Sequence, residues 1–300
     1  MTIEAEFRVA LQAKAILGEG LHWDDARSVL WMVDIHGRRV IAWQLDAVSA
    51  QEWTLPQRVG WVIPCARSDA LLLGMQQGFA LAREDDELAL EWLACPFAGH
   101  AELRLNDAKA DSSGAVWAGS LNNDDESRSD GCLFRLDPQG RVRIVDCGYQ
   151  VANGPTLSPD ARWMLHTDSG RRTIYAFDLD VASGRLDGKR VWKVFSEADG
   201  YPDGMCFDTE GCVWVAHWGA GCVSRFSADG SLLRRIALPA ARITNVCFAG
   251  PDLDRLFVTS ARVGMTPEEA AAQPDAGSLF EILAPGVRGL RSLPYVCSPA

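Results

Sequence analysis

Six segments of the chain repeat one internal design, and this repeat constrains the fold more than any other feature. Each segment opens with a small or polar cluster, continues as a short apolar stretch, turns, and ends in a second apolar stretch. The second stretches carry the anchors Trp31, Leu72, Trp117, Leu165, Trp214 and Phe257. Anchors spaced roughly 40–50 residues apart, within short strand-like runs, are typical of a β-propeller.

The rest of each segment also has the composition of strands and tight turns. A third apolar run follows the first two and often ends in an acidic turn, as at Asp229-Gly230. The sequence therefore predicts an all-β protein, a six-bladed β-propeller of four-stranded antiparallel blades, forming a single domain over residues 1–300. Residues 6–12 form an early strand that completes the last blade. A short loop helix is expected at 267–273, with Thr266 as its N-cap and Glu269 three residues on.

Charge and cysteine content limit the classes of partner and compartment. A net charge of −11 would repel a nucleic-acid backbone, so no nucleic-acid partner is expected. No apolar stretch reaches the roughly 18 residues of a membrane helix, and the first residues lack the apolar core of a signal peptide. The chain has nine cysteines, an odd number, and none of them form a C-x-x-C motif. We therefore expect reduced thiols and a cytoplasmic location.

Polar residues recur at one position of the repeat. Counting back from the anchors leads to Glu19, Gly60, Asn106, Asn153, Asp203 and Asn245. Equivalent positions of all blades converge on one axis, so these residues are expected to meet. The oxygen ligands of Glu19, Asn153 and Asp203 suit Ca²⁺, Mg²⁺ or Mn²⁺. Alternatively, these polar residues only satisfy strand ends around a wet channel.

The segment before the third anchor adds a cation beside this position. On an extended strand, Arg104 and Asn106 point to the same side and would hold a polyol or carbonyl, whereas Asp107 points away and anchors a turn. The polar stretch 121–130 is either a solvated loop or a mobile rim over the site. Trp61 and Tyr201 suit the face of a sugar ring or a place in the core. The five histidines lack zinc spacing, and there is no G-x-S-x-G, P-loop or dinucleotide motif.

Together, the ordered motifs resemble the sugar lactonases related to gluconolactonase, regucalcin (senescence marker protein) and luciferin-regenerating enzyme. The strings that carry the resemblance are Leu17-Gly18-Glu19-Gly20, Arg104-Leu105-Asn106-Asp107, Asp111-Ser112-Ser113-Gly114, Asn153-Gly154-Pro155, Tyr201-Pro202-Asp203-Gly204 and Phe248-Ala249-Gly250-Pro251. In pattern the chain is most similar to bacterial pentono- and aldonolactonases. The resemblance implies one catalytic divalent metal (Ca, Mg, Mn, Zn or Fe(II)) in the channel, held by Glu19, Asn153 and Asp203. It also implies substrate contacts from Arg104 and Asn106.

The chain departs from the family pattern after its third anchor. Some members carry a substrate-contacting Glu there, where this chain reads Ser120-Leu121-Asn122-Asn123. The contact is therefore missing, or comes from Asn122 or a later acidic residue. Ala161 and Ala249 replace family glycines, which are milder changes.

The expected function is metal-dependent hydrolysis of a sugar lactone, such as a pentono- or gluconolactone, to its aldonic acid. Asp203 would be the general base, and Arg104 and Asn106 would orient the sugar hydroxyls. Two alternatives stay open: a lactonase or esterase with a non-sugar substrate, and a non-catalytic metal-binding propeller. The expected partner is a small molecule, with neither nucleic acid nor membrane, and the sequence does not define the oligomeric state.

Overall fold

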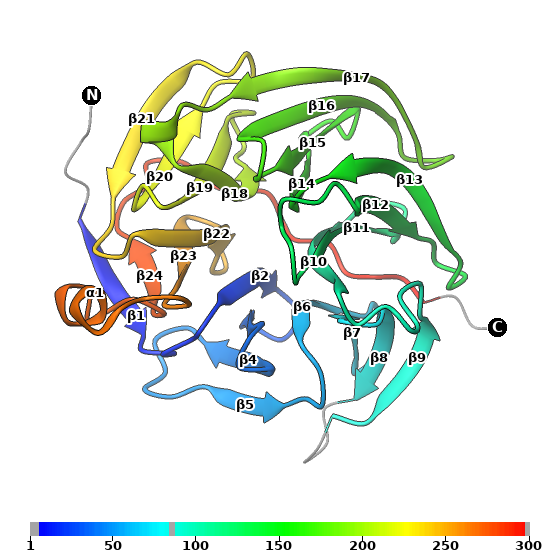
Figure 1. Cartoon of the computed structure of the whole chain (residues 1–300), viewed down its shortest axis with the longest axis horizontal. Helices are drawn as coiled ribbons and strands as arrows, with labels where there is room; N and C mark the ends of the chain where they lie inside the picture. The colour runs from blue at the N-terminus through cyan, green and yellow to red at the C-terminus, as the bar shows by residue number, and fades with distance from the viewer. Residues whose placement is uncertain (1–5, 84–87, 298–300) are drawn as a thin grey trace.

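A computed structural model describes residues 6–83 and 88–297, and almost all of its regular structure is β-strand. The antiparallel sheets stand around a ring, an arrangement consistent with a β-propeller (Figure 1). The short helix α1 (Pro267–Ala272) lies outside the ring. Thr266 caps it, and Glu269 completes a capping box, as the sequence predicts. No helix in the described ranges is long and apolar enough to cross a membrane.

Four of the sheets have four strands each, and their strands follow chain order. The first two are β2 (Gly18–Asp24), β3 (Val29–Asp34), β4 (Arg39–Gln44), β5 (Gln51–Thr54), and β6 (Val59–Pro64), β7 (Ala70–Met75), β8 (Phe79–Arg83), β9 (Leu90–Ala94). The next two are β10 (Leu103–Ala110), β11 (Val116–Asn122), β12 (Gly131–Leu136), β13 (Val142–Tyr149), and β14 (Ala152–Leu157), β15 (Trp163–Asp168), β16 (Thr173–Asp180), β17 (Arg185–Val194). The 3₁₀ turn η1 (Glu197–Asp199) follows them.

The remaining eight strands form one larger sheet in the order β1-β24-β23-β22-β19-β20-β21, with β18 also paired to β19. Its strands are β18 (Tyr201–Phe207), β19 (Val213–Trp218), β20 (Cys222–Phe226), β21 (Leu232–Ala237), β22 (Arg242–Ala249), β23 (Arg255–Ala261), β24 (Leu279–Ile282) and β1 (Phe7–Leu11). A single residue pair, Trp218 with Arg242, joins β19 to β22. The N-terminal strand β1 pairs antiparallel with β24, although the two are far apart in sequence.

The first strand of each unit lies toward the middle of the ring, where β2, β6, β10, β14, β18 and β22 contact one another in a closed cycle (Figure 1). Close approach requires glycine at some of these contacts: a Cβ on Gly60 would lie 2.5 Å from the backbone oxygen of Asn106. Each of the six strands also has an irregularity in its pairing with the next strand, at the same place in the repeat. Such a β-bulge interrupts the strict alternation of side chains between the two faces.

The apolar core lies between neighbouring sheets rather than along the axis. All six anchors are buried, and Trp31, for example, packs in one cluster with Val33, Val62 and Leu73 from two adjacent sheets. Burial of such residues is the main favourable term in folding. Because each sheet packs one face against each neighbouring sheet, the core fixes the position of the six inner strands around the ring.

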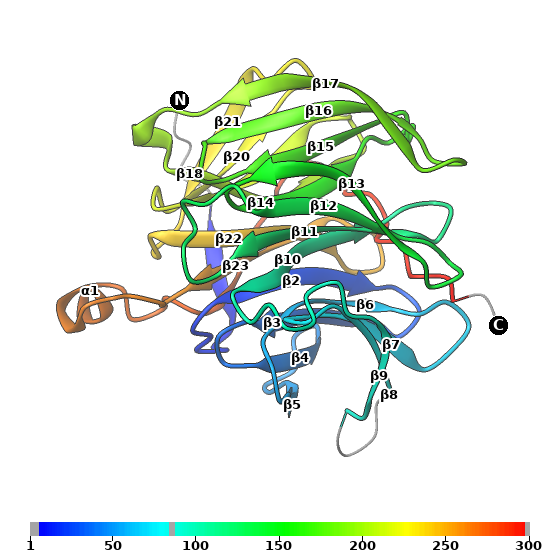
Figure 2. The ribbon, with the colours of Figure 1, turned by 45° about the vertical axis from the view of Figure 1, so that its right-hand side comes forward.

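The C-terminal segment, residues 286–296, crosses the base of the ring (Figures 1 and 2). It hydrogen-bonds to the turns that follow several inner strands: Thr209 N donates to Arg288 O, Ala66 N to Tyr295 O, and Val296 N to Gly114 O. Gly289 and Tyr295 also form isolated bridges with Asp208 and Cys65. The segment therefore ties the turns together beneath the channel.

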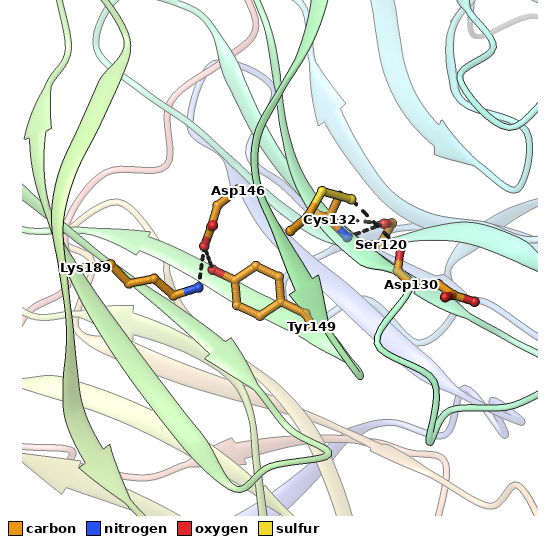
Figure 3. Close-up of a disulfide and its surroundings, with 7 residues drawn as sticks. Ser120, Asp130, Cys132, Asp146, Tyr149 and Lys189 are labelled. Atoms are coloured by element: carbon orange, nitrogen blue, oxygen red, sulfur yellow. Dashed lines mark hydrogen bonds and ion pairs between the residues drawn. A yellow bond between two sulfur atoms is a disulfide. The ribbon is translucent and has the colours of Figure 1, made fainter.

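The expectation that all cysteines are reduced is wrong for two of them. Cys132 on β12 and Cys147 on β13 form a disulfide (Figure 3). They are direct partners across the two strands, with Cα atoms 4.0 Å apart, so pairing geometry that the sequence does not display brings them together. Beside them, Ser120 Oγ accepts a hydrogen bond from Cys132 N, and Asp146 binds Lys189 and the Tyr149 hydroxyl. Buried Cys65, Cys222 and Cys247 remain thiols.

Candidate active site

Three carboxylates from three different inner strands come together at the axis. Glu19 lies on β2, Asp107 on β10 and Asp203 on β18, and each side chain is buried. Each residue sits at the bulge of its strand. Their charges act on one another strongly enough that each of Glu19 and Asp107 raises the pKa of Asp203. The bulges thus place negative groups from distant parts of the chain within mutual electrostatic reach.

Side-chain amides from two further inner strands donate hydrogen bonds to these carboxylates. Asn245 on β22 donates through Nδ2 to Glu19 Oε2 at 3.0 Å and to Asp107 Oδ2 at 3.4 Å. Asn153 on β14 donates through Nδ2 to Asp203 Oδ1 and to Ser169 Oγ. The Asn245 Oδ1 atom is buried and accepts no hydrogen bond from any described residue. A buried acceptor without a donor is costly and points to a missing partner at this place.

Burial gives the carboxylates an unusual protonation equilibrium. It raises the pKa of Glu19 to about 8, with the negative charge of Asp107 as the next cause. The same two effects, burial and neighbouring carboxylates, raise the pKa of Asp203 well above its usual range. Burial also raises the pKa of Asp107. Without a compensating positive charge, these groups resist full ionisation at neutral pH.

The prediction that Asp107 points away and anchors a turn is wrong. Its Oδ2 accepts a hydrogen bond from Gly154 N at 3.0 Å, on the neighbouring inner strand β14, and another from Asn245 on β22. The prediction assumed strict alternation along an extended strand, but the pairing of β10 with β11 shifts between Leu105 and Ala108. Because of the bulge, Asp107 joins the side chains at the axis instead of pointing away. We call this group the axial cluster; its members are Glu19, Asp107, Asn153, Asp203 and Asn245.

The residues expected to contact substrate lie beside the carboxylates. Arg104 Nη1 donates to Asn106 Oδ1 at 2.5 Å, and Asn106 Nδ2 donates to Ala152 O at 3.0 Å. Both side chains are buried. Burial lowers the pKa of Arg104 to about 10, partly offset by the charges of Glu126, Glu19 and Asp203. Even so, the guanidinium is charged at neutral pH.

Three residues around Arg104 were not singled out from the sequence. Glu126 lies in the loop after β11, and its charge acts on Arg104 more strongly than that of Glu19. Arg58, just before β6, and half-buried His36 also lie within electrostatic reach of Arg104. None of the three occupies the repeated position, so periodicity gave no signal for them.

The loop after β11 is held by its own hydrogen bonds. Asn122 is buried; its Oδ1 accepts from the backbone N–H groups of Asp124 and Asp125, and its Nδ2 donates to Asp130. Asn122 is therefore occupied in shaping the loop, whereas Glu126 of the same loop acts on Arg104 through its charge. Of the two aromatic candidates, Trp61 is buried in the core, whereas Tyr201 is half-exposed and stacks on Arg172.

The residues at the axis fit a divalent cation held by oxygen ligands. No three His, Cys, Asp or Glu side chains in the described ranges are arranged to hold a metal by themselves. The metal ligands predicted from the sequence are of a different kind, because they combine the amide of Asn153 with the carboxylates of Glu19 and Asp203. The excess of buried carboxylate charge and the partnerless Asn245 Oδ1 are what a hard cation would stabilise.

The chain is similar to several known proteins over almost its whole length. Residues 17–262 match the family described as SMP-30/Gluconolactonase/LRE-like region. Regucalcin from Danio rerio is 32% identical and covers 95% of this chain and 96% of its own length. A 6-deoxy-6-sulfogluconolactonase from Pseudomonas putida is 31% identical, covering 91% and 93%. The structure of a calcium-binding protein, regucalcin, from Agrobacterium tumefaciens superposes with a TM-score of 0.93, at 26% identity over 98% and 99% of the two chains.

The predicted resemblance is thus confirmed, and so, at the level of the family, is the prediction of a hydrolase acting on lactones. The chain belongs to the SMP-30/gluconolactonase/LRE-like family.

Proposed function

We propose that this protein is a metal-dependent hydrolase that opens a sugar lactone to its aldonic acid. The observation that carries the proposal is the axial cluster itself. It combines three buried carboxylates with raised pKa values, two amides that donate hydrogen bonds to them and a buried Arg-x-Asn pair beside them. A scaffold that only binds a partner has no need to bury so much unbalanced charge.

Glu19, Asn153 and Asp203 would hold the cation, a role that fits the oxygen chemistry of their side chains. When bound, a divalent cation polarises a lactone carbonyl and stabilises negative charge on its oxygen. The relative named as calcium-binding supports calcium as a candidate, with Mg, Mn, Zn and Fe(II) as the others.

The remaining steps fall to side chains of this chain. Asp203, ionised beside the bound cation and holding it through one carboxylate oxygen, would accept a proton from the attacking water through the other. Arg104 donates to the ring oxygens and hydroxyls of the sugar, and Asn106 fixes the guanidinium through their mutual hydrogen bond. Glu126 accepts from a sugar hydroxyl at the rim and takes the place of the glutamate that some family members carry after the third anchor.

The fold proposal is a single domain with six blades. In it, the eight-stranded sheet counts as two blades, β18 to β21 and β22 to β24 with β1. A single residue pair, Trp218 with Arg242, joins the two blades by strand pairing. The closed cycle of contacts among the six inner strands supports this division. The cytoplasmic location stays a prediction, and the Cys132–Cys147 disulfide removes the argument from reduced cysteines. A small-molecule partner, without nucleic acid or membrane, is likewise part of the proposal.

A panel of lactones tests the function directly. The purified protein, supplied with each candidate cation in turn, should release acid from pentono- and hexonolactones faster than from γ-butyrolactone, which lacks hydroxyls. Faster turnover of simple lactones or aryl esters would favour the non-sugar alternative. Absence of hydrolysis with every cation would support the non-catalytic alternative.

A further inference from the structure

A second layer of side chains lines the channel farther along the same six inner strands. These residues are the strand partners of the six anchors, and we call them the base layer: His22, Ile63, Lys109, Thr156, Cys206 and Cys247. The axial cluster lies closer to the start of each strand, on the other side of the bulges. The base layer takes no part in the function proposed above.

All of the base layer except Ile63 borders a cavity of about 240 Å³. Taking about 30 Å³ for the liquid volume of one water, this space equals roughly eight waters. The outer wall comes from the C-terminal segment, residues 290–293, where it crosses the base of the ring. Phe207, Phe248, Leu290 and Leu293 give the cavity apolar walls.

The charge of this cavity is opposite to that of the axial cluster. Among the described residues, its lining contains Lys109 and Arg291 but neither Asp nor Glu. Arg291 is paired with Asp25 at 2.9 Å. Lys109 makes no hydrogen bond or ion pair with any residue in ranges 6–83 and 88–297. Its ammonium is partly buried and therefore available to an anion in the cavity.

The nearby carboxylate of Asp107 does not form an ion pair with Lys109. Asp107 lies within electrostatic reach of Lys109, but its oxygens accept hydrogen bonds from Ala108 N, Gly154 N and Asn245. His22 is only 5% exposed, borders the cavity, and has no hydrogen-bond partner in the described part of the chain. Its imidazole therefore offers an unused donor or acceptor to whatever fills the space.

We propose that this cavity binds a small organic monoanion, a short-chain carboxylate. Its carboxylate lies against the Lys109 ammonium and the His22 imidazole, and its hydrocarbon part lies against Phe207 and Phe248. Thr156 and Ser292 also border the cavity, and their hydroxyls complete the polar contacts. The volume suits an acid of a few carbons, and the single free cation suits one negative charge.

Isothermal titration of the full-length protein with sodium butyrate tests the proposal, with butyramide as the uncharged probe. Butyrate should bind and butyramide should bind at least about tenfold more weakly, since a hydrogen bond to a charged group contributes that much or more. Lys109→Met should weaken butyrate binding by a similar factor, and Lys109→Arg should retain part of it. Lys14→Met removes the same charge from an exposed site and should bind like the wild type.

A crystal structure of the wild-type protein with butyrate locates the ligand and stays informative if Lys109→Met does not fold. Density for butyrate beside Lys109 would support the proposal. Water alone in the cavity, equal affinity for butyrate and butyramide, or unchanged affinity in Lys109→Met would overturn it. Lactone hydrolysis is a separate readout, so failure of the proposed function and failure of this site are distinguishable.

Discussion

The axial cluster and the base layer occupy the same six strands, yet their chemistry is opposite. The axial cluster gathers Glu19, Asp107 and Asp203, whereas the base layer offers Lys109 as its only charged group among the described residues. Both layers are built by the same repeat and the same bulges. The repeat therefore fixes where side chains converge, and only the individual residues decide what the two places bind.

Burial acts on both layers by favouring neutral forms. It raises the pKa of Glu19 to about 8 and lowers the pKa of His22 to about 3, with Lys109 as the next cause for His22. A bound cation would stabilise the ionised carboxylates of the axial cluster, and a bound anion would stabilise the charged ammonium of Lys109. The predictions below test this contrast, in order of decreasing expected effect.

The largest effect is expected at Asp203. Asp203→Ala removes both a proposed ligand and the proposed base, so it should abolish cation retention and lower hydrolysis by about 10²–10⁴-fold. Asp203→Asn should keep more of the cation while losing the base. Metal content by mass spectrometry and turnover of a sugar lactone check both. Full activity in either variant would contradict the proposed role of Asp203.

Arg104→Ala should leave the cation bound but slow hydrolysis of a polyhydroxylated lactone by about 10²-fold, because a positioning contact is lost. A lactone without hydroxyls should suffer less. The comparison of the two rates, with a melting curve, separates substrate contact from simple bracing of β10. Equal losses on both substrates would assign Arg104 a structural role.

Gly60→Ala tests the close packing of inner strands that both layers share. Its Cβ would meet the backbone oxygens of Asn106 and Leu105 at 2.5 and 2.9 Å, so unfolding free energy should fall by about 1–3 kcal/mol. Gly140→Ala is a useful control, because its position is open and only its φ of 77° opposes alanine, at about 1 kcal/mol. Urea denaturation measures both. An equal or smaller loss for Gly60→Ala would argue against tight contact between β6 and β10.

We expect the folded protein to lose stability in acid because of His22 in the base layer. The folded-state pKa of His22 lies below its unfolded value of 6.5, so the folded protein binds this proton less readily. Stability is therefore present above pH 6.5 and is lost as pH falls toward about 3, with a slope approaching about 1.4 kcal/mol per pH unit for this proton. His22→Gln should flatten urea-measured stability between pH 6 and 4. The wild type measured in the same series is the reference, and an unchanged slope in His22→Gln would refute the assignment.

Periodicity alone predicts much of this architecture. The anchors, the inner strands and the positions of Glu19, Asn153 and Asp203 follow from the repeat, since a buried apolar strand leaves a clear pattern. The direction of the Asp107 side chain was predicted wrongly because the bulge arises from the pairing of β10 with β11. No local sequence pattern reveals that pairing. The Cys132–Cys147 disulfide and the approach of Glu126 to Arg104 were missed for the same reason: both depend on contacts between strands or loops rather than on spacing.

Removal and return of the metal test the central claim most directly. The protein is stripped with a chelator, and release of acid from a sugar lactone is followed in a pH-stat before and after addition of Ca²⁺, Mg²⁺, Mn²⁺, Zn²⁺ or Fe²⁺. If the axial carboxylates form a cation-dependent hydrolytic site, stripped protein is inactive and at least one of these ions restores turnover. Full activity of the stripped protein, matched by an unchanged rate on adding each ion, would contradict the account.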